Sequence, residues 1–257
     1  MMLFIVFFLI TVVGPVVFWF WIFIRQDRAE PEPKKTLIKS FFWGIGAAIF
    51  AIGVEGTIFF LLFSNQYIHL LKEDLAQVST GSFLEILALV FLAGVIEEII
   101  KFFVLKQFIY AKTDFNQIAD GVFYAVALAL GFSFFENIFY FYDFFTGMTT
   151  TGFIVSASVR GIVTTLLHLT ATGIIGYALG RMKFSIEHKK STIIKFILLA
   201  ILLHGFFNIL VSLPYGSIFA FVITLLVLFY LINILKKPET RLVWKLINPQ
   251  GSKDLKV

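Results

Sequence analysis

The sequence predicts an all-α, polytopic membrane protein with about seven transmembrane helices. Of its 257 residues, 59% are hydrophobic and only 14% are charged, and the mean hydropathy is +0.93. These values lie outside the range of soluble globular domains. Several windows are apolar over about 20 residues, which is the length that an α-helix needs to span a bilayer. In chain order the windows cover residues 3–24, 37–63, 83–108, 119–142, 153–179, 193–212 and 217–235.

The first window, residues 3–24, differs from a cleaved signal peptide in two respects. No basic residue precedes its apolar run, and the run is longer than the ~15 residues of a signal-peptide core. We therefore expect a permanent anchor, followed by an extended linker around Pro31 and Pro33. On this basis the chain divides into an N-terminal anchor and linker (1–36), a helical membrane core (37–235) and a basic tail (236–257).

Lysine and arginine residues indicate which side of the membrane is cytoplasmic, because cytoplasmic loops carry an excess of both. All of the 21 Lys and Arg residues except Lys72, Lys101 and Arg160 cluster around the connections after the first, third and fifth windows and in the tail. This alternation of charge is independent of hydropathy, and it agrees with seven spans. It predicts that the N-terminus is outside the cell and the C-terminus inside.

The net charge of +5 does not indicate nucleic-acid binding. The basic residues are spread over every predicted cytoplasmic connection, and no aromatic stacking platform accompanies them. Anionic lipid headgroups at the inner membrane surface account for such a distribution, so membrane lipid is an expected partner. Because the sequence contains no cysteine, disulfide bonds and thiolate chemistry are excluded.

Ionisable side chains inside the apolar windows are the main evidence on function, because a charge in the middle of a bilayer is costly. In the third window, Glu97 and Glu98 precede Lys101 at helical spacing, so one ammonium can reach both carboxylates. An internal ion pair that lets the helix insert would explain one glutamate and leave the second without a role. Two adjacent carboxylates in a dry site are also what a general base and a general acid need. We therefore interpret the pair as part of a buried reactive site.

Two histidines in later windows suit the same site. His168 lies in the fifth window, and His204 lies in the sixth, one turn before Asn208. Helical rise places Glu98 and His168 at matching depths, ~8 Å from the predicted cytoplasmic face. A lone histidine in an apolar helix is usually a satisfied interior residue, whereas two histidines beside a carboxylate pair favour a shared site.

Glu136 and Asn137, in the fourth window, allow two interpretations. Both side chains suit a hydrogen-bonded contact with a neighbouring helix as well as a place in the site. Helical rise puts Glu136 near the outer face, so either its helix begins later than residue 119 or Glu136 is not part of the site. In the fifth window, Gly176 and Gly180 form a GxxxG pattern, which predicts close packing between helices.

Together these residues form four ordered motifs that resemble those of the PrsW-type intramembrane proteases, relatives of the CAAX prenyl endopeptidases and of the bacterial CPBP proteins. The resemblance covers residues 92–208, and the ordered set is specific where each motif alone is weak. The motifs are Glu97-Glu98-x-x-Lys101, Asp120-Gly121 with Phe132-x-x-x-Glu136-Asn137, Arg160 with His168, and His204-Gly-Phe-Phe-Asn208.

The resemblance implies an intramembrane endopeptidase in a prokaryotic cell membrane, in which the glutamate pair activates water. The implied catalytic residues are Glu97, Glu98, His168, His204 and Asn208. The implied supporting residues are Lys101, Glu136, Asn137 and Arg160. Where the prenyl endopeptidases have a histidine in the second motif, this chain has Glu136, the form found in the PrsW branch. The implied substrates are single-pass membrane proteins such as anti-sigma factors.

Two versions of the mechanism are compatible with these residues. In the first, Glu97 or Glu98 takes a proton from a water molecule near His168, while His204 and Asn208 donate hydrogen bonds to the oxyanion. In the second, zinc binds His168 and His204 with a carboxylate as third ligand. The signatures of other intramembrane proteases are missing from the sequence: it has no His-Glu-x-x-His, no Gly-x-Ser-Gly and no Gly-x-Gly-Asp.

Two functions of other classes are also considered. One is a non-catalytic scaffold, because the seven-helix scaffold subunit of γ-secretase looks like a distant relative of this chain with the same orientation. The presence of both glutamates argues against a scaffold. A proton-coupled transporter or channel is the other, with the buried glutamates and histidines as a relay. The lack of internal repeats and of prolines near these residues argues against a transporter.

Overall fold

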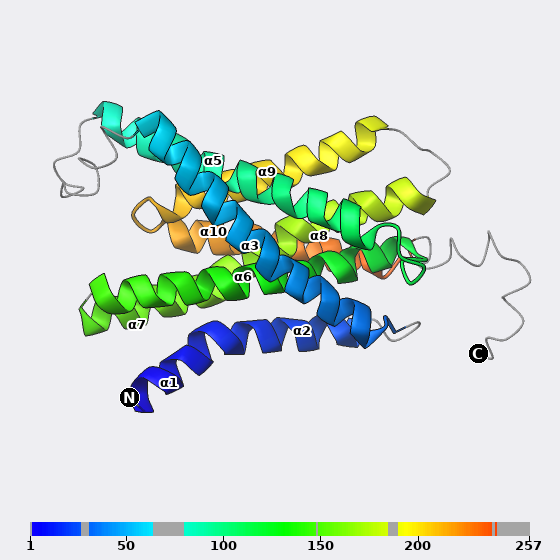
Figure 1. Ribbon diagram of the computed structural model, residues 1–257, viewed down its shortest axis with the longest axis horizontal. Coiled ribbons are helices and arrows are strands. Elements are labelled where there is room, and N and C mark those ends of the chain that lie inside the picture. The colour runs from blue at the N-terminus through cyan, green and yellow to red at the C-terminus, as the bar shows by residue number, and fades with distance from the viewer. Residues whose placement is uncertain are drawn as a thin grey trace, which may run out of the picture.

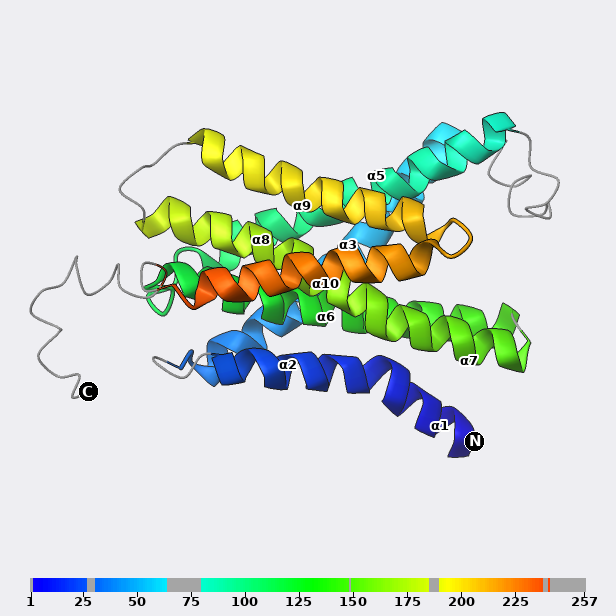
Figure 2. The same cartoon turned by 180° about the vertical axis from the view of Figure 1, so that it is seen from behind.

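The computed structural model describes residues 2–26, 31–63, 80–147, 149–184, 190–237 and 240, and within these ranges every regular element is a helix (Figures 1 and 2). Three of the membrane segments contain a π-helical turn. The elements are α1 (Met2–Phe8), η1 (Leu9–Val13), α2 (Gly14–Gln26), α3 (Lys34–Phe63), α5 (Thr80–Val104), η3 (Leu105–Ile109), α6 (Ile118–Gly147), α7 (Thr150–Val159), η4 (Arg160–Thr164), α8 (Thr165–Phe184), α9 (Lys190–Val211) and α10 (Gly216–Leu235).

The predicted all-α membrane protein is confirmed. Among the described residues, six helices are long and apolar enough to cross a membrane, and each coincides with a predicted window. The remaining window, residues 83–108, corresponds to α5 and η3. At 25 residues α5 is long enough to span a bilayer, but it is not among the six, because it carries four charged residues, Glu85, Glu97, Glu98 and Lys101. The count of seven spans therefore depends on α5 and stays a prediction.

Helices α6 and α8 form the centre of the bundle. Every residue of α8 from Thr165 to Gly180 is buried, and α8 packs along α6 while α3 crosses the other side of α6 (Figure 1). Helix α9 packs between α5 and α8, and α10 packs against α8 (Figure 2). Because the central helices contact protein on all sides, polar side chains on α6 and α8 can be shielded from lipid.

Glycines allow the two central helices to approach closely. A Cβ atom on Gly176 would lie 2.1 Å from the carbonyl oxygen of Gly121, and one on Gly180 would lie 2.4 Å from that of Ile118. Any side chain at these positions would push α8 away from α6. The predicted role of Gly176 and Gly180 in close packing is thereby confirmed.

The chain passes back and forth through the bundle, so alternate connections gather at the same end. The ends of α2, η3, α8 and α10 and the starts of α3, α6 and α9 lie together at one end, at the right in Figure 1. The predicted cytoplasmic connections are the ones at this basic end, which agrees with the alternation of charge along the sequence. The orientation of the bundle in the membrane stays a prediction. Most of the predicted basic tail, 236–257, lies outside the described residues.

Candidate active site

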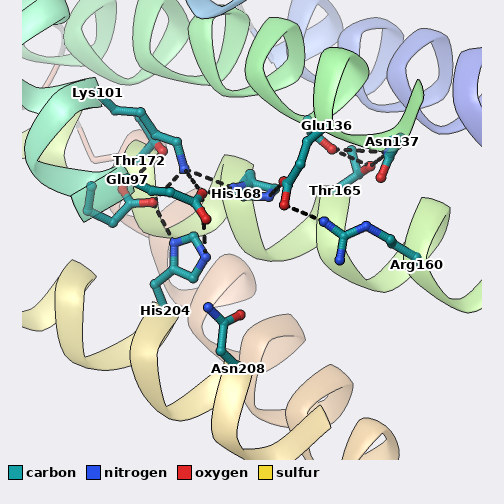
Figure 3. Close-up of polar contacts among 12 residues, drawn as sticks. Glu97, Lys101, Glu136, Asn137, Arg160, Thr165, His168, Thr172, His204 and Asn208 are labelled. Carbon is teal, nitrogen blue, oxygen red and sulfur yellow. Dashed lines mark hydrogen bonds and ion pairs between the residues drawn. The ribbon is translucent and has the colours of Figure 1, made fainter. Parts of the chain in front are cut away.

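Helix α5 contributes two carboxylates and one ammonium to the centre of the bundle. Lys101 follows Glu97 and Glu98 by four and three residues, so all three side chains share one face of the helix. The Nζ of Lys101 lies 3.1 Å from Oε2 of Glu97 and 2.9 Å from Oε1 of Glu98 (Figure 3). All three residues are buried. The structure therefore places the predicted ion pairs inside the bundle, with one ammonium bonded to both carboxylates.

His168, on α8, connects α5 to α6. Its Nδ1 lies 2.9 Å from Nζ of Lys101 and its Nε2 lies 2.7 Å from Oε2 of Glu136 (Figure 3). An ammonium group can only donate, so Nδ1 must accept, and the ring hydrogen belongs on Nε2, where it is donated to Glu136. The two neighbours therefore define both the tautomer and the orientation of the imidazole.

His204, on α9, is oriented by the second glutamate of α5. Its Nδ1 lies 2.7 Å from Oε1 of Glu98, which assigns the ring hydrogen to Nδ1 and leaves Nε2 with a lone pair. Glu98 also accepts hydrogen bonds from Lys101 and, through Oε2, from the hydroxyl of Thr172 at 3.1 Å. Glu98 is thus held by three donors, whereas Glu97 accepts a hydrogen bond from Lys101.

Glu136 belongs to this cluster, although its estimated depth suggested otherwise. Its carboxylate pairs with Arg160 of η4 as well as with His168. Helix α6 begins at Ile118, so a later start does not explain the contact. Instead α6 continues to Gly147, beyond the predicted end at residue 142, so Glu136 lies farther from the outer end of its helix than the depth estimate assumed. Side chains also lean toward the N-terminus of their own helix, so those of Glu136 and His168 point toward each other from antiparallel helices.

The two predicted asparagines have different surroundings. Nδ2 of Asn137 donates to the hydroxyls of Ser133 and Thr165, at 3.2 and 3.1 Å, and so connects α6 to α8 beside the site. Nδ2 of Asn208 donates to the carbonyl oxygen of Val90 at 3.0 Å and so connects α9 to α5. Asn208 also lines the cavity described next, whereas Asn137 does not.

A cavity of about 450 Å³ leads from the cluster toward the end of the bundle opposite the basic connections. Glu97, His168 and His204 line its base, and Val211 and Ser212 line it where α9 ends. The other lining residues are Glu55, Phe59, Ile86, Leu89, Val90, Ala93, Glu136, Tyr140, Arg160, Thr164, Phe207 and Asn208. Glu98 and Lys101 are not among the lining residues, so of the adjacent glutamates only Glu97 faces this cavity.

Glu55 was missed by the sequence analysis. It lies on α3, and its side chain lines the same cavity as Glu97 and Glu136. It is the only acidic residue in α3, and a single carboxylate inside an apolar window is the signal that identifies it. Tyr140 was missed as well; its ring stacks under the guanidinium of Arg160 at 3.3 Å, and it belongs to no polar motif along the sequence.

The donor atoms at the base of the cavity suit a divalent metal ion. Among the described residues, Glu97, His168 and His204 each offer one ligand atom within 4.8 Å of the other two. Oε2 of Glu97 lies 3.7 Å from Nδ1 of His168 and 3.8 Å from Nε2 of His204. Both nitrogens carry a lone pair; that of His168 accepts a hydrogen bond from Lys101 in this structure, and a bound metal ion would take the place of this hydrogen bond. Each imidazole donates its remaining hydrogen to a carboxylate, as metal-binding histidines do. Two nitrogens and one oxygen form a donor set that zinc accepts.

An all-helical membrane protein with buried glutamates and histidines at the base of an open cavity has the features of an intramembrane hydrolase. Comparison with protein families gives the particular group. The family described as "PrsW family intramembrane metalloprotease" matches residues 32–234, a range that includes every candidate residue. The chain belongs to this family, and it is accordingly a protease and an integral membrane protein.

Curated relatives agree with this assignment. The protein named Protease PrsW of Geobacillus kaustophilus is 26% identical over 186 residues, which cover 72% of this chain and 71% of the relative. Protease PrsW of Clostridioides difficile is 27% identical over 230 residues, 88% of each chain. Protease PrsW of Oceanobacillus iheyensis is 34% identical over 122 residues, 48% of this chain and 53% of the relative. These bacterial relatives indicate a prokaryotic origin. No solved structure matches the chain.

Proposed function

We propose that this protease hydrolyses a peptide bond of single-pass membrane proteins, with Glu97 as the general base that activates water. The observation that supports this most directly is the position of Glu97. It faces the cavity, it accepts a hydrogen bond from Lys101, and its Oε2 lies 3.7 and 3.8 Å from ring nitrogens of His168 and His204. Glu98 is surrounded by three donors behind the cavity wall, which suits a positioning residue better than a base.

The remaining residues have distinct roles in this proposal. Lys101 compensates the charge of both glutamates, and Glu98 and Glu136 orient His204 and His168. Asn208 supplies the hydrogen bond to the oxyanion, because its amide has two hydrogens and Val90 takes one of them. His204 directs a lone pair toward Glu97, so in this tautomer its Nε2 cannot donate to an oxyanion.

In a version of the mechanism with a metal ion, for which zinc is our proposal, Glu97 would be a ligand together with His168 and His204 and would not act as the free base. When bound, such an ion supplies polarisation of the scissile carbonyl and activation of water at neutral pH. The chain itself supplies the orientation of the donors, because Glu136 and Glu98 fix the two imidazoles.

The location of the site supports this substrate class. The cavity gives a peptide bond a route to the buried cluster, and the carbonyls of a transmembrane helix are already hydrogen-bonded within the helix. The substrate must therefore present an unwound stretch at or near the end of its membrane segment. A single-pass regulator of the anti-sigma-factor type meets this requirement, because its cleavage would separate a cytoplasmic domain from an outer one.

The test is a quantitative membrane proteome of cells that express the wild type, Glu97→Gln, Glu98→Gln or Glu85→Gln at matched levels. Glu85 is a carboxylate of α5 that does not line the cavity, so its variant is the control. We expect a few single-pass proteins to accumulate at full length with Glu97→Gln and to appear as trimmed fragments with the wild type and Glu85→Gln. Identical fragments in all four strains would contradict a catalytic role for Glu97.

A further inference from the structure

Glu55 lies inside an apolar helix where a carboxylate needs a specific reason. Apart from Thr57, the residues around it in α3 are glycine and aliphatic or aromatic side chains, and no other acidic residue occurs in the helix. Insertion of a carboxylate into such a stretch is costly, whether it is charged or protonated. The side chain points to the cavity, where it lies with Glu97 and Glu136 rather than against lipid.

One oxygen of Glu55 has no hydrogen-bond partner in the part of the chain that the structure describes. Its Oε1 is buried and accepts no hydrogen bond, and among the described residues it is the only carboxylate oxygen in this condition. Glu97 and Glu136 differ, because Lys101 donates to the first and Arg160 pairs with the second. A buried carboxylate oxygen without a donor is costly. A donor supplied by a molecule that enters the cavity would remove this cost.

The charge of the cavity wall favours a cationic donor. Three carboxylates line the cavity, those of Glu55, Glu97 and Glu136, and Arg160 is the only Lys or Arg side chain among the lining residues. The guanidinium of Arg160 already pairs with Glu136 and stacks on Tyr140. Negative charge in a concave site with low-dielectric walls concentrates cations.

We propose that Glu55 is the recognition group of a substrate subsite that selects a lysine or arginine side chain close to the scissile bond. The proposal rests on the proposed function, because it assumes that the cavity binds a peptide. The ammonium or guanidinium of the substrate donates to Oε1 of Glu55, and its aliphatic stem packs against Phe59, one turn along the same helix, which also lines the cavity. The chemistry at Glu97 is unchanged by this contact.

The test uses a set of model single-pass proteins that are identical except for one residue. This residue is Lys, Arg, Gln, Met or Glu, and it is placed in turn at successive positions near the end of the membrane segment. Each is incorporated into liposomes with purified wild type, Glu55→Gln, Glu55→Lys or Glu85→Gln, and fragments are quantified. At one position, we expect the wild type to cut the Lys and Arg members about tenfold faster than the Met member, as loss of a charge-assisted hydrogen bond implies.

The variants distinguish recognition from chemistry. Glu55→Gln should slow cleavage of the Lys and Arg members about tenfold and affect the other members much less, Glu55→Lys should favour the Glu member, and Glu85→Gln should keep the wild-type preference. If Glu55→Lys does not fold, the comparison of Glu55→Gln with Glu85→Gln still decides. An unchanged preference in Glu55→Gln overturns the proposal, and so does an equal loss for every member, which would assign Glu55 to the reaction itself. A wild type that cuts no member overturns the proposed function and this subsite with it.

Discussion

The ammonium of Lys101 on α5 lies 2.9 Å from Nδ1 of His168 on α8, although 67 positions separate them in the chain. This contact determines which ring nitrogen of His168 carries the proton. Because Lys101 donates to Nδ1, the hydrogen of His168 lies on Nε2 and is directed at Glu136. Lys101 therefore does more than neutralise the glutamates of its own helix. It sets the tautomer of a histidine that the sequence shows only as an isolated residue.

Loss of the hydroxyl of Thr172 should impair the reaction without unfolding the protein. Thr172 donates to Oε2 of Glu98 at 3.1 Å, and Glu98 in turn orients His204. We expect Thr172→Val to lower kcat/KM about tenfold, because a hydrogen bond to a charged group is lost. The measurement is fragment release from a membrane substrate in liposomes.

Thr170 supplies the control for this substitution. It is two residues away on the same helix, equally buried, and its hydroxyl donates to the carbonyl oxygen of Leu166 at 2.7 Å within the helix. Thr170→Val should therefore change activity less than threefold, by the small net value of a neutral hydrogen bond. Equal losses of activity in Thr170→Val and Thr172→Val would show that α8 tolerates no valine here. The loss in Thr172→Val would then be no evidence that Glu98 orients His204.

Metal binding should depend on residues that do not touch the ion. We expect the purified protein to bind zinc through Glu97, His168 and His204, and His204→Ala to lose most of this binding. Glu98→Gln should weaken affinity about 10- to 100-fold, because Glu98 orients His204 from behind. Zinc titration against a coloured chelator measures this without any substrate, with Glu85→Gln as the control. Full activity of metal-free wild-type enzyme after chelation would instead favour the glutamate mechanism without metal.

Much of the fold is readable from the sequence because the bilayer imposes strong requirements. An apolar window must be helical and about 20 residues long, so six helices coincide with predicted windows. The glutamate pair and Lys101 are readable for a similar reason, since they lie on one helix at a fixed spacing. Contacts between helices are not encoded by spacing, and this explains why the partnership of Glu136 and His168 had to come from the structure.

The depth estimate shows where such reasoning stops. Helical rise locates a Cα atom, whereas the reacting atoms of Glu136 and His168 lie several bonds away and lean in opposite directions. The missed Glu55 has another cause. It belongs to no spaced pair, and its relevance depends on the cavity, which residues from α3, α5, α6, α8, α9 and η4 line together. The lone carboxylate is visible in the sequence of α3, but nothing within that helix shows that its side chain lines this cavity.

Close packing of α3 on α6 should be sensitive to a single methyl group. A Cβ atom on Gly44 would lie 1.9 Å from the carbonyl oxygen of Leu128, whereas one on Gly46 would have no atom within 4 Å. We expect Gly44→Ala to destabilise the protein by about 1–3 kcal/mol through overpacking and Gly46→Ala to be neutral or slightly stabilising. Thermal unfolding in detergent measures both. Equal midpoints for the two variants would contradict the close approach of α3 and α6.

The cavity should open on the side of the membrane opposite the basic connections. Ser212 is exposed and lines the cavity at the end of α9, Ala93 lines it deeper on α5, and Lys112 is exposed at the basic end. Because the chain has no cysteine, Ser212→Cys, Ala93→Cys and Lys112→Cys each carry a single thiol that a membrane-impermeant maleimide can report. In intact cells we expect labelling of Ser212→Cys, slower labelling of Ala93→Cys, and none of Lys112→Cys until the membrane is permeabilised.

The opposite pattern would mean that the basic connections face outward, against the excess of Lys and Arg that cytoplasmic loops carry. Labelling of Ser212→Cys but not of Ala93→Cys would agree with the predicted orientation of the bundle. It would contradict an open path to the glutamates, because the reagent would stop at the cavity mouth.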